Sequence, residues 1–180
     1  MKILIIFLFL FSFISSAQSS QKKNLNNLFS QLQNINNSKS AALLEKKIWS
    51  IWNEHPNDFK LTEKLEFGTE LMQYGDYNYA LRVFTNILKN DPKWSEAWNK
   101  RATVYFLMSQ FKNSLNDIDK VLDIEPRHFG ALSGQARIFI KLQEYEKAIK
   151  SIENALKFYP SFKSRELIPE IERLIKEESV

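Results

Sequence analysis

The sequence predicts an all-α protein built as a solenoid of helical hairpins. The first observation is a pattern of apolar and small residues that recurs every 34 residues between Leu61 and Phe162. The second is a small side chain at the same two places of each interval. The third is a proline that closes each interval, at Pro92, Pro126 and Pro160. A period of this length is typical of repeats that bury an apolar face only when about three or more of them stack.

The clearest interval, Ser95 to His128, is expected to hold one helix near Ser95–Ser109 and a second near Phe111–Ile124. A small side chain where two helices cross lets the backbones approach, and larger apolar side chains fill the space around it. Proline ends the second helix because it lacks an amide donor and disfavours a helical residue before it. Gly75 is expected in the turn between the two helices of the preceding interval.

This pattern resembles the tetratricopeptide repeat (TPR): a large apolar residue, a small one four positions later, an aromatic three further on, a small residue in the second helix and a closing proline. The resemblance implies a right-handed TPR superhelix with repeats at 61–94, 95–128 and 129–162. It also implies the structural residues, which are Gly68, Ala80, Trp98, Ala102, Tyr105, Ala136, Ala148, Pro92, Pro126 and Pro160. It says little about activity, because one fold hosts many functions.

Residues 1–17 have the pattern of a signal peptide. A single lysine precedes an almost unbroken apolar run from Ile3 to Ile14, and the small residues that follow favour cleavage between Ala17 and Gln18. The alternative is an uncleaved membrane anchor, but a spanning helix needs about 20 apolar residues and this run is shorter. We therefore expect a periplasmic or secreted protein with no stable membrane span after cleavage.

The composition excludes several classes of function. The chain has no cysteine, which excludes disulfides, thiol catalysis and zinc–thiolate sites. Its formal charge is +4, or +3 without Lys2, and charges of both signs are mixed along the chain. Nucleic-acid-binding proteins usually show a clustered basic face, so no nucleic-acid partner is expected.

Residues 18–60 are predicted to form N-terminal helices that amount to a degenerate repeat. Apolar residues fall at helical spacing in this Ser-, Gln- and Asn-rich stretch, namely Leu25, Leu28, Phe29, Leu32 and Ile35. The segment Leu25–Asp58 then matches one hairpin, joined to the next repeat by an extra Phe59–Lys60. The alternative is a disordered tail to about Asn37, followed by a lone capping helix.

Residues 163–180 are predicted to form a capping helix and a tail. Leu167, Ile171, Leu174 and Ile175 lie on one face of this helix, and charged residues lie on the other. A solenoid needs such a helix to cover its last apolar stripe. Pro169 either starts the helix within its first turn or kinks it.

Arg101 occupies a position where TPR proteins usually have an apolar residue, and Gln135 occupies it in the following repeat. A charge in such a partly buried place needs partners, and Asp117, Asp119 and Asp123 of the same repeat are the candidates. An internal Arg–Asp clamp between helices is therefore favoured over a ligand-binding role.

No catalytic residue, metal site or cofactor is predicted. The two histidines, His55 and His128, are expected in loops where they cap helix ends, and neither has a second metal-type ligand at helical spacing. No nucleophile-elbow, phosphate-loop, dinucleotide or zinc-protease motif occurs. The four tryptophans are expected mostly in the core, with one of Trp49 and Trp52 partly exposed.

The remaining candidate site is the concave groove, which the first helices line in the TPR family. The resemblance places these residues there: Leu65, Thr69, Met72, Asn99, Lys100, Thr103, Phe106, Ser133, Arg137, Ile140 and Lys141. The lining becomes basic towards the C-terminal end. It departs from the clamp with which some cytosolic relatives hold a chaperone's C-terminal carboxylate, because Leu65, Lys100 and Gly134 stand where that clamp has Lys, Asn and Arg or Lys.

The function expected from these observations is a non-enzymatic protein–protein interaction scaffold in an exported compartment. Its groove would hold an extended or helical segment of an unknown protein partner, and Lys100, Arg137 and Lys141 would favour an acidic stretch. The alternative is a structural module of the cell envelope that self-associates end to end through its terminal helices. A third hypothesis is a catalytic or ligand-binding role centred on Arg101 and His128.

Overall fold

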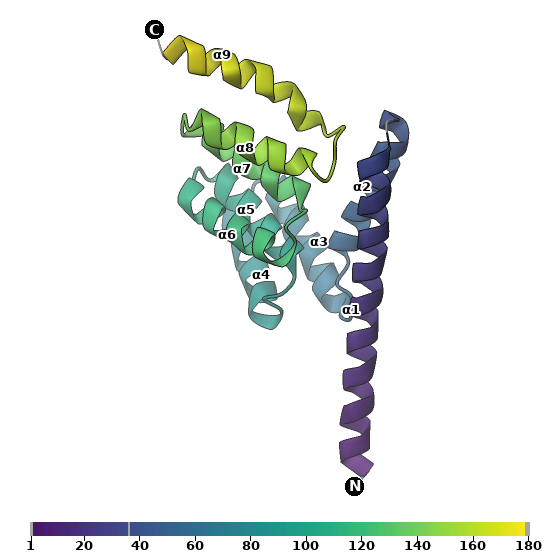
Figure 1. Cartoon of the computed structure of the whole chain (residues 1–180). Coiled ribbons are helices and arrows are strands. Elements are labelled where there is room, and N and C mark those ends of the chain that lie inside the picture. Colours follow the sequence, from purple (N-terminus) through teal and green to yellow (C-terminus); the bar gives the residue numbers. More distant parts are fainter. Residues whose placement is uncertain (1, 36, 179–180) are drawn as a thin grey trace. The chain divides into compact units, whose positions relative to one another are not determined.

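The computed structural model describes residues 2–35 and 37–178, with side chains from residue 18 to residue 177 apart from residue 36 (Figure 1). Every regular element in this part of the chain is a helix, which confirms the all-α prediction. The chain divides into two compact units, residues 1–63 and 64–180.

The first unit holds helices α1 (Lys2–Asn34) and α2 (Ser38–Asn53). Residues 18–34 are therefore helical and do not form an irregular tail. Both helices carry buried apolar residues at helical spacing. These residues are Leu25, Phe29 and Leu32 in α1, and Ala41, Leu44, Ile48 and Trp52 in α2. The side chains of the predicted signal peptide, residues 1–17, lie outside the part of the chain for which side chains are described.

Capping side chains set where the helices of the first unit begin. Asn37 accepts a hydrogen bond from the Ser40 amide at the start of α2. Asp58 accepts hydrogen bonds from the amides of Lys60 and Leu61 at 2.9 and 3.3 Å. Helix α3 consequently begins at Phe59, so the two extra residues Phe59–Lys60 that precede the repeat register form the first turn of this helix.

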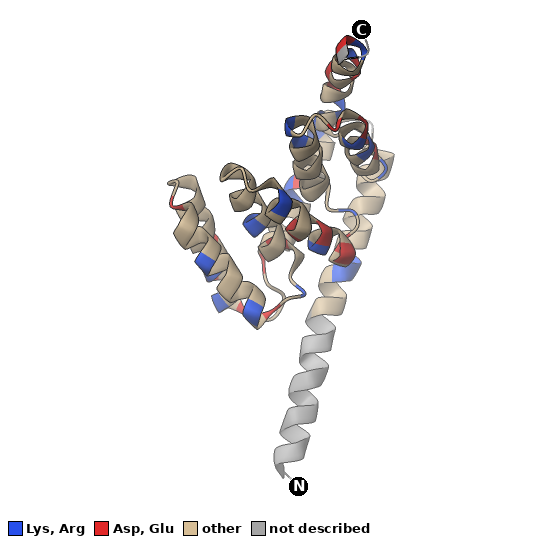
Figure 2. Cartoon of the chain, turned by 90° about the vertical axis from the view of Figure 1, so that its left-hand side faces the viewer, with Lys and Arg blue, Asp and Glu red and all other residues tan. Residues whose placement is uncertain are grey.

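The second unit, which includes α3 (Phe59–Gln73) from residue 64 onward, stacks three hairpins: α3 with α4 (Tyr77–Asn90), α5 (Ser95–Leu107) with α6 (Phe111–Ile124), and α7 (Phe129–Lys141) with α8 (Tyr145–Leu156). The tight turns inside the hairpins place one residue each at positive φ, namely Gly75, Ser109 and Gln143. These three residues are 34 positions apart, so the turn geometry repeats even where glycine is replaced. Lys and Arg are interspersed with Asp and Glu along these helices (Figure 2).

Small side chains lie at the helix crossings, as predicted. A β-carbon on Gly68 would lie 2.6 Å from the ring of Phe84 in α4, which is closer than atoms can approach. The alanines at the repeated small positions are fully or almost fully buried: Ala80, Ala102, Ala136 and Ala148. The close approach of the two helices in each hairpin therefore depends on these positions.

The aromatic residues predicted to surround them lie closer to the surface than expected. Trp98 and Tyr105 are half-buried, and the Trp98 indole N–H donates to the Pro92 carbonyl at 2.9 Å. The guanidinium carbon of Arg101 lies 4.8 Å from the Trp98 ring centroid and 5.8 Å from that of Tyr105. Both rings therefore pack against an arginine, and Trp98 also packs against the buried cluster that contains Ala102 and Ile118.

The prolines mark the ends of the hairpins unequally. Helices α4 and α6 end two residues before Pro92 and Pro126. Helix α8 ends at Leu156, four residues before Pro160, so this proline does not itself end the helix. Instead Tyr159, which is buried, and Phe162 pack with Phe129 at ring-centroid distances of 5.5 and 5.4 Å, respectively. The third hairpin is thus closed by an aromatic cluster.

A terminal cap follows the third hairpin, as predicted. A 3-10 turn, η1 (Lys163–Leu167), leads into α9 (Ile168–Glu178), and Pro169 lies in the first turn of that helix. The apolar face of α9 packs against a cluster of α7 and α8 residues that includes Ile152. Among the described residues, no helix combines the length and hydrophobicity needed to cross a membrane.

Candidate partner-binding groove

The predicted groove residues are carried by α3, α5 and α7 of the second unit, and they differ in exposure. Thr103, Arg137 and Lys141 are exposed. A second group is half-buried: Thr69, Met72, Lys100, Phe106, Ser133 and Ile140. Leu65 is 1% exposed and Asn99 is 9% exposed, so their assignment to an open lining is wrong. Helical periodicity gives the face of a residue but not its depth.

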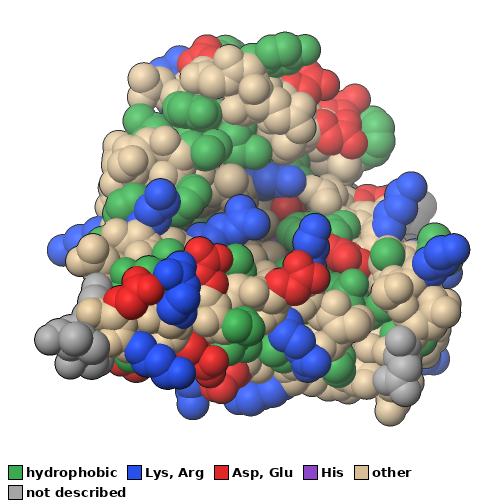
Figure 3. Space-filling model, turned by 90° about the horizontal axis from the view of Figure 1, so that it is seen from above, with side chains coloured by type: hydrophobic (Ala, Val, Ile, Leu, Met, Phe, Trp, Pro, Cys, Tyr) green, Lys and Arg blue, Asp and Glu red, His purple; other side chains and the backbone are tan. Residues whose placement is uncertain are grey.

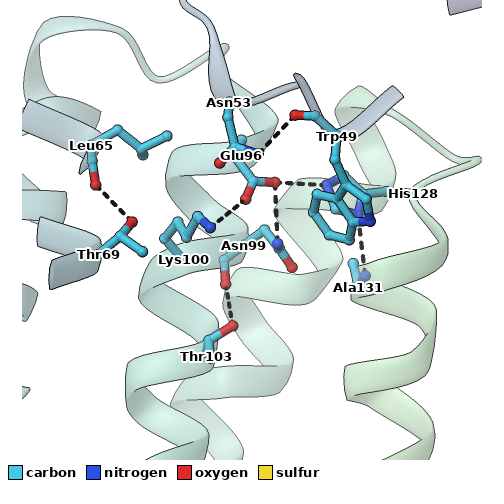
Figure 4. A network of polar contacts seen from close by, with 10 residues as sticks. All are labelled: Trp49, Asn53, Leu65, Thr69, Glu96, Asn99, Lys100, Thr103, His128 and Ala131. Atoms are coloured by element: carbon cyan, nitrogen blue, oxygen red, sulfur yellow. Dashed lines mark hydrogen bonds and ion pairs between the residues drawn. The ribbon is translucent and has the colours of Figure 1, made fainter. Parts of the chain in front are cut away.

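A buried polar network centred on Glu96 occupies the first turn of α5 (Figure 4). The Glu96 carboxylate is fully buried, and its Oε2 lies 3.0 Å from His128 Nε2 and 3.1 Å from Asn99 Nδ2. Its Oε1 lies 3.3 Å from Lys100 Nζ, so the two side chains form an ion pair, but the geometry between them is not that of a well-aligned hydrogen bond. Glu96 is not among the residues predicted from the sequence, because nothing near it in the chain distinguishes it from a surface glutamate.

His128 connects two hairpins through its two ring nitrogens. Nδ1 accepts a hydrogen bond from the Ala131 amide at 3.1 Å and caps α7, as predicted. A nitrogen that accepts carries no proton, so in the neutral ring the proton is on Nε2 and is donated to Glu96. His55, in contrast, accepts from the Asn57 amide at 3.3 Å within its loop and caps no helix through that bond.

The surroundings of Glu96 keep it ionised. Burial alone would raise the pKa of this carboxyl group, but the hydrogen bond with His128 and the charge of Lys100 outweigh it. The pKa of Glu96 therefore lies below its ordinary value of 4.5. The negative charge in turn compensates the positive charge of Lys100.

Compensation of Lys100 leaves Arg137 and Lys141 as the uncompensated cations among the predicted groove residues. Both are exposed and lie one turn apart on α7, and neither forms an ion pair with a described residue. On the face of the molecule shown in Figure 3, basic, acidic and hydrophobic side chains are interspersed, with no large area of one sign. The basic character predicted for the lining therefore reduces to one end of α7.

The hydroxyl groups of the groove are already used by the protein. Thr69 donates to the Leu65 carbonyl at 2.7 Å and Thr103 donates to the Asn99 carbonyl at 2.9 Å, each within its own helix (Figure 4). Ser133 shares a hydrogen bond of 3.0 Å with Ser164 of η1. The groove thus offers a partner few free donors apart from Arg137 and Lys141.

Arg101 forms the predicted internal clamp. Its Nε and Nη2 donate to the two carboxylate oxygens of Asp117 in α6, each at 2.8 Å, and its Nη1 donates to Thr85 in α4 at 3.2 Å. The hydrogen bonds to Asp117 raise the pKa of Arg101 against the opposing effect of burial. One residue of α5 therefore links three helices, and of the three predicted aspartates Asp117 is the partner.

The two remaining tryptophan candidates belong to the first unit. Trp49 and Trp52 both lie on α2 of the first unit, with ring centroids 5.3 Å apart in an edge-on arrangement. Trp49 is half-buried and Trp52 is buried, which fits the expectation that one is partly exposed. Within the described side chains, no three His, Asp or Glu residues are grouped closely enough to hold a metal ion.

Comparison with known proteins places this geometry among helical repeats. Residues 130–162 match the tetratricopeptide repeat family. A TPR repeat-containing protein of Rhizobium etli is 33% identical over 146 residues, which cover 81% of this chain and 71% of the relative. The Hsp70-Hsp90 organizing protein 1 of Glycine max is 26% identical over 64% of this chain, but the match spans 20% of that protein.

Solved structures show the same fold. The first TPR of Spaghetti (RPAP3), bound to the HSP90 peptide SRMEEVD, superposes with a TM-score of 0.61 at 23% identity. The match covers 65% of this chain and 94% of that structure. This likeness shows the architecture of the stacked hairpins, and the right-handed solenoid predicted from the repeat pattern is confirmed.

Proposed function

The chain belongs to the tetratricopeptide repeat family, and from this premise we propose that it is a non-enzymatic scaffold that holds a segment of a partner protein in the groove of α3, α5 and α7. Structurally similar TPR domains bind peptides, as the HSP90 peptide on Spaghetti illustrates. A stack of rigid hairpins with a lined groove can do the same here without catalytic groups.

The observation that carries the proposal is the pair Arg137 and Lys141. Two uncompensated cations stand one turn apart on α7, beside the partly exposed apolar side chain of Ile140. Such an arrangement attracts a partner segment that is acidic at one place and apolar next to it. Lys100 contributes little, because Glu96 already neutralises it.

The test is capture of a partner in the native host by a photoreactive residue placed at Thr103. We expect a specific crosslinked protein, and we expect the double variant Arg137→Glu/Lys141→Glu to reduce its yield at least about tenfold. The control Lys112→Glu/Lys150→Glu makes the same charge change on exposed positions of α6 and α8 and should leave the yield unchanged. Equal capture by both folded double variants would rule the groove out.

The proposed compartment is the periplasm or another exported location, supported by the apolar run Ile3–Ile14 and the small residues after it. Mass spectrometry of the protein purified from its host should find Gln18 as the first residue. A chain that retains Met1 and fractionates with cytosolic proteins would contradict this assignment.

Self-association through the C-terminal helix has weaker support. The apolar residues of α9 that would join two chains, Leu174 and Ile175, pack against the cluster of α7 and α8 in their own chain. Both side chains are therefore partly covered within their own chain, which leaves less apolar surface for an end-to-end contact.

A further inference from the structure

We infer that the segment held in this groove is an amphipathic α-helix with an acidic flank, and not an extended peptide. This inference rests on the proposed function and specifies the partner of the same site. Three features of the groove carry it: its committed donors, the spacing of its apolar side chains and the position of its free charges.

The hydrogen-bond donors of the groove that are already bonded within the protein disfavour an extended partner segment. The backbone carbonyls of an extended peptide need hydrogen-bond donors wherever they leave water. In this groove the hydroxyl hydrogens of Thr69 and Thr103 are already donated to their own helices. An α-helix satisfies its backbone internally and therefore asks little of such a lining.

The apolar side chains fit the repeat of a helix. Met72, Phe106 and Ile140 occupy the same position of three successive first helices and are all half-buried, so part of each side chain faces solvent. Packed helices lie about 8–10 Å apart, and residues seven positions apart on an α-helix are separated by about 10.5 Å along its axis. A helix across the stack can thus set one apolar side chain against each hairpin.

Extended conformations of a partner segment either fit this spacing less well or need hydrogen-bond donors that the groove does not supply. In a β-strand, side chains on one face recur at about 6.6 or 13 Å, which does not match neighbouring hairpins. A polyproline II segment advances about 9.3 Å per turn and would match, but it has no internal hydrogen bonds and leaves its carbonyls unsatisfied in this groove.

The free charges fix the chemistry of the flank. Arg137 and Lys141 stand at the α7 end of the row, on the same helix as Ile140. Acidic side chains on the partner helix next to its last apolar position would meet both cations.

The experiment compares synthetic probes on the full chain. The helical probe has about 20 residues, with leucine at every seventh position, glutamate beside the last leucine and alanine and glutamine elsewhere. A permuted probe has the same composition with its leucines spread around the helix. The third probe is the acidic peptide SRMEEVD, which is too short to form a stable helix in water. Binding is measured by fluorescence anisotropy and circular dichroism.

We expect the helical probe to bind at least about tenfold more tightly than either other probe and to gain helicity on binding. Arg137→Glu/Lys141→Glu should weaken it at least about tenfold, and Lys112→Glu/Lys150→Glu should not. Tighter binding of SRMEEVD, equal binding of the permuted probe, or no binding of the helical probe would each overturn the inference. A partner captured through Thr103 in the host would still support the groove in those cases, so the two failures are distinguishable.

Discussion

The second and third hairpins of the stack use different side-chain contacts between their two helices at equivalent positions of the repeat. Arg101 of α5 is bound to Asp117 of α6 by two charged hydrogen bonds. At the positions 34 residues later, the Ser151 hydroxyl of α8 lies 2.8 Å from Gln135 Oε1 of α7 and 3.0 Å from the Lys147 carbonyl of its own helix, so its single hydrogen is shared between two neutral acceptors. The backbone around both pairs is the same hairpin. The fold therefore needs a contact between the two helices at this place, and not a particular charge.

The first test of this comparison removes one partner from each pair. Asp117→Ala leaves Arg101, whose side chain is 16% exposed, without its counter-charge, and should lower the free energy of unfolding by about 3 kcal/mol. Ser151→Ala removes a neutral bond and should cost about 1 kcal/mol. Urea unfolding followed by circular dichroism measures both values.

A transplant of the neutral pair sharpens the same test. The double variant Arg101→Gln/Asp117→Ser gives the second hairpin the pair of the third, and should unfold within about 1 kcal/mol of the parent. A double variant as unstable as Asp117→Ala would show that the charges themselves are required.

The glycines at Gly68 and Gly134 give a smaller contrast between the first and third hairpins. A β-carbon on Gly68 would meet Phe84 at 2.6 Å, so Gly68→Ala should destabilise by about 1–3 kcal/mol. On Gly134 the nearest atom, Ile118 Cδ1, would be 3.7 Å away, so Gly134→Ala should stabilise α7 by up to about 1 kcal/mol. Thermal melting of the two variants should shift in opposite directions, and a shift in the same direction would contradict the crossing geometry.

Acid should lower the stability of the second hairpin through Glu96. We expect this effect to be smaller than those of the substitutions above and to be confined to low pH. The pKa of Glu96 is lowered in the folded protein, so the unfolded chain takes up a proton first as the pH falls. The stabilisation is present above the ordinary pKa of 4.5 and is lost as the pH falls through the lower folded value. The free energy of unfolding, measured from pH 7 to pH 3, should show this loss in the parent and a weaker pH dependence in Glu96→Gln. The exposed control Glu153→Gln should have the same pH dependence as the parent.

The fold was predictable because its determinants are local and periodic. The 34-residue interval, the small residues Gly68 and Ala102, and the cap at residues 163–180 each follow from patterns within one or two helices. The Arg101–Asp117 clamp was also within reach, because a charge at a usually apolar position requires a partner and the facing helix supplies three aspartates.

The site was less predictable because burial depends on neighbours distant in the chain. Glu96 is buried with His128, 32 positions away, and no property of either residue alone indicates the bond. The same limit explains Leu65 and Asn99, which lie on the predicted helix face but at a depth that exposes almost none of their side chains. The donors lost to local bonds at Thr69 and Thr103 are likewise visible only in the folded chain.

The bond between Glu96 and His128 has a consequence for how the stack melts. Solenoids can lose one repeat at a time, since each unit contacts only its neighbours. Here, fraying of the N-terminus of α7 would strand an anion inside α5, so the opening of one hairpin penalises the next. The second and third hairpins should therefore exchange their amide hydrogens as a single cooperative block, which gives the groove a rigid frame on which to display its few free charges.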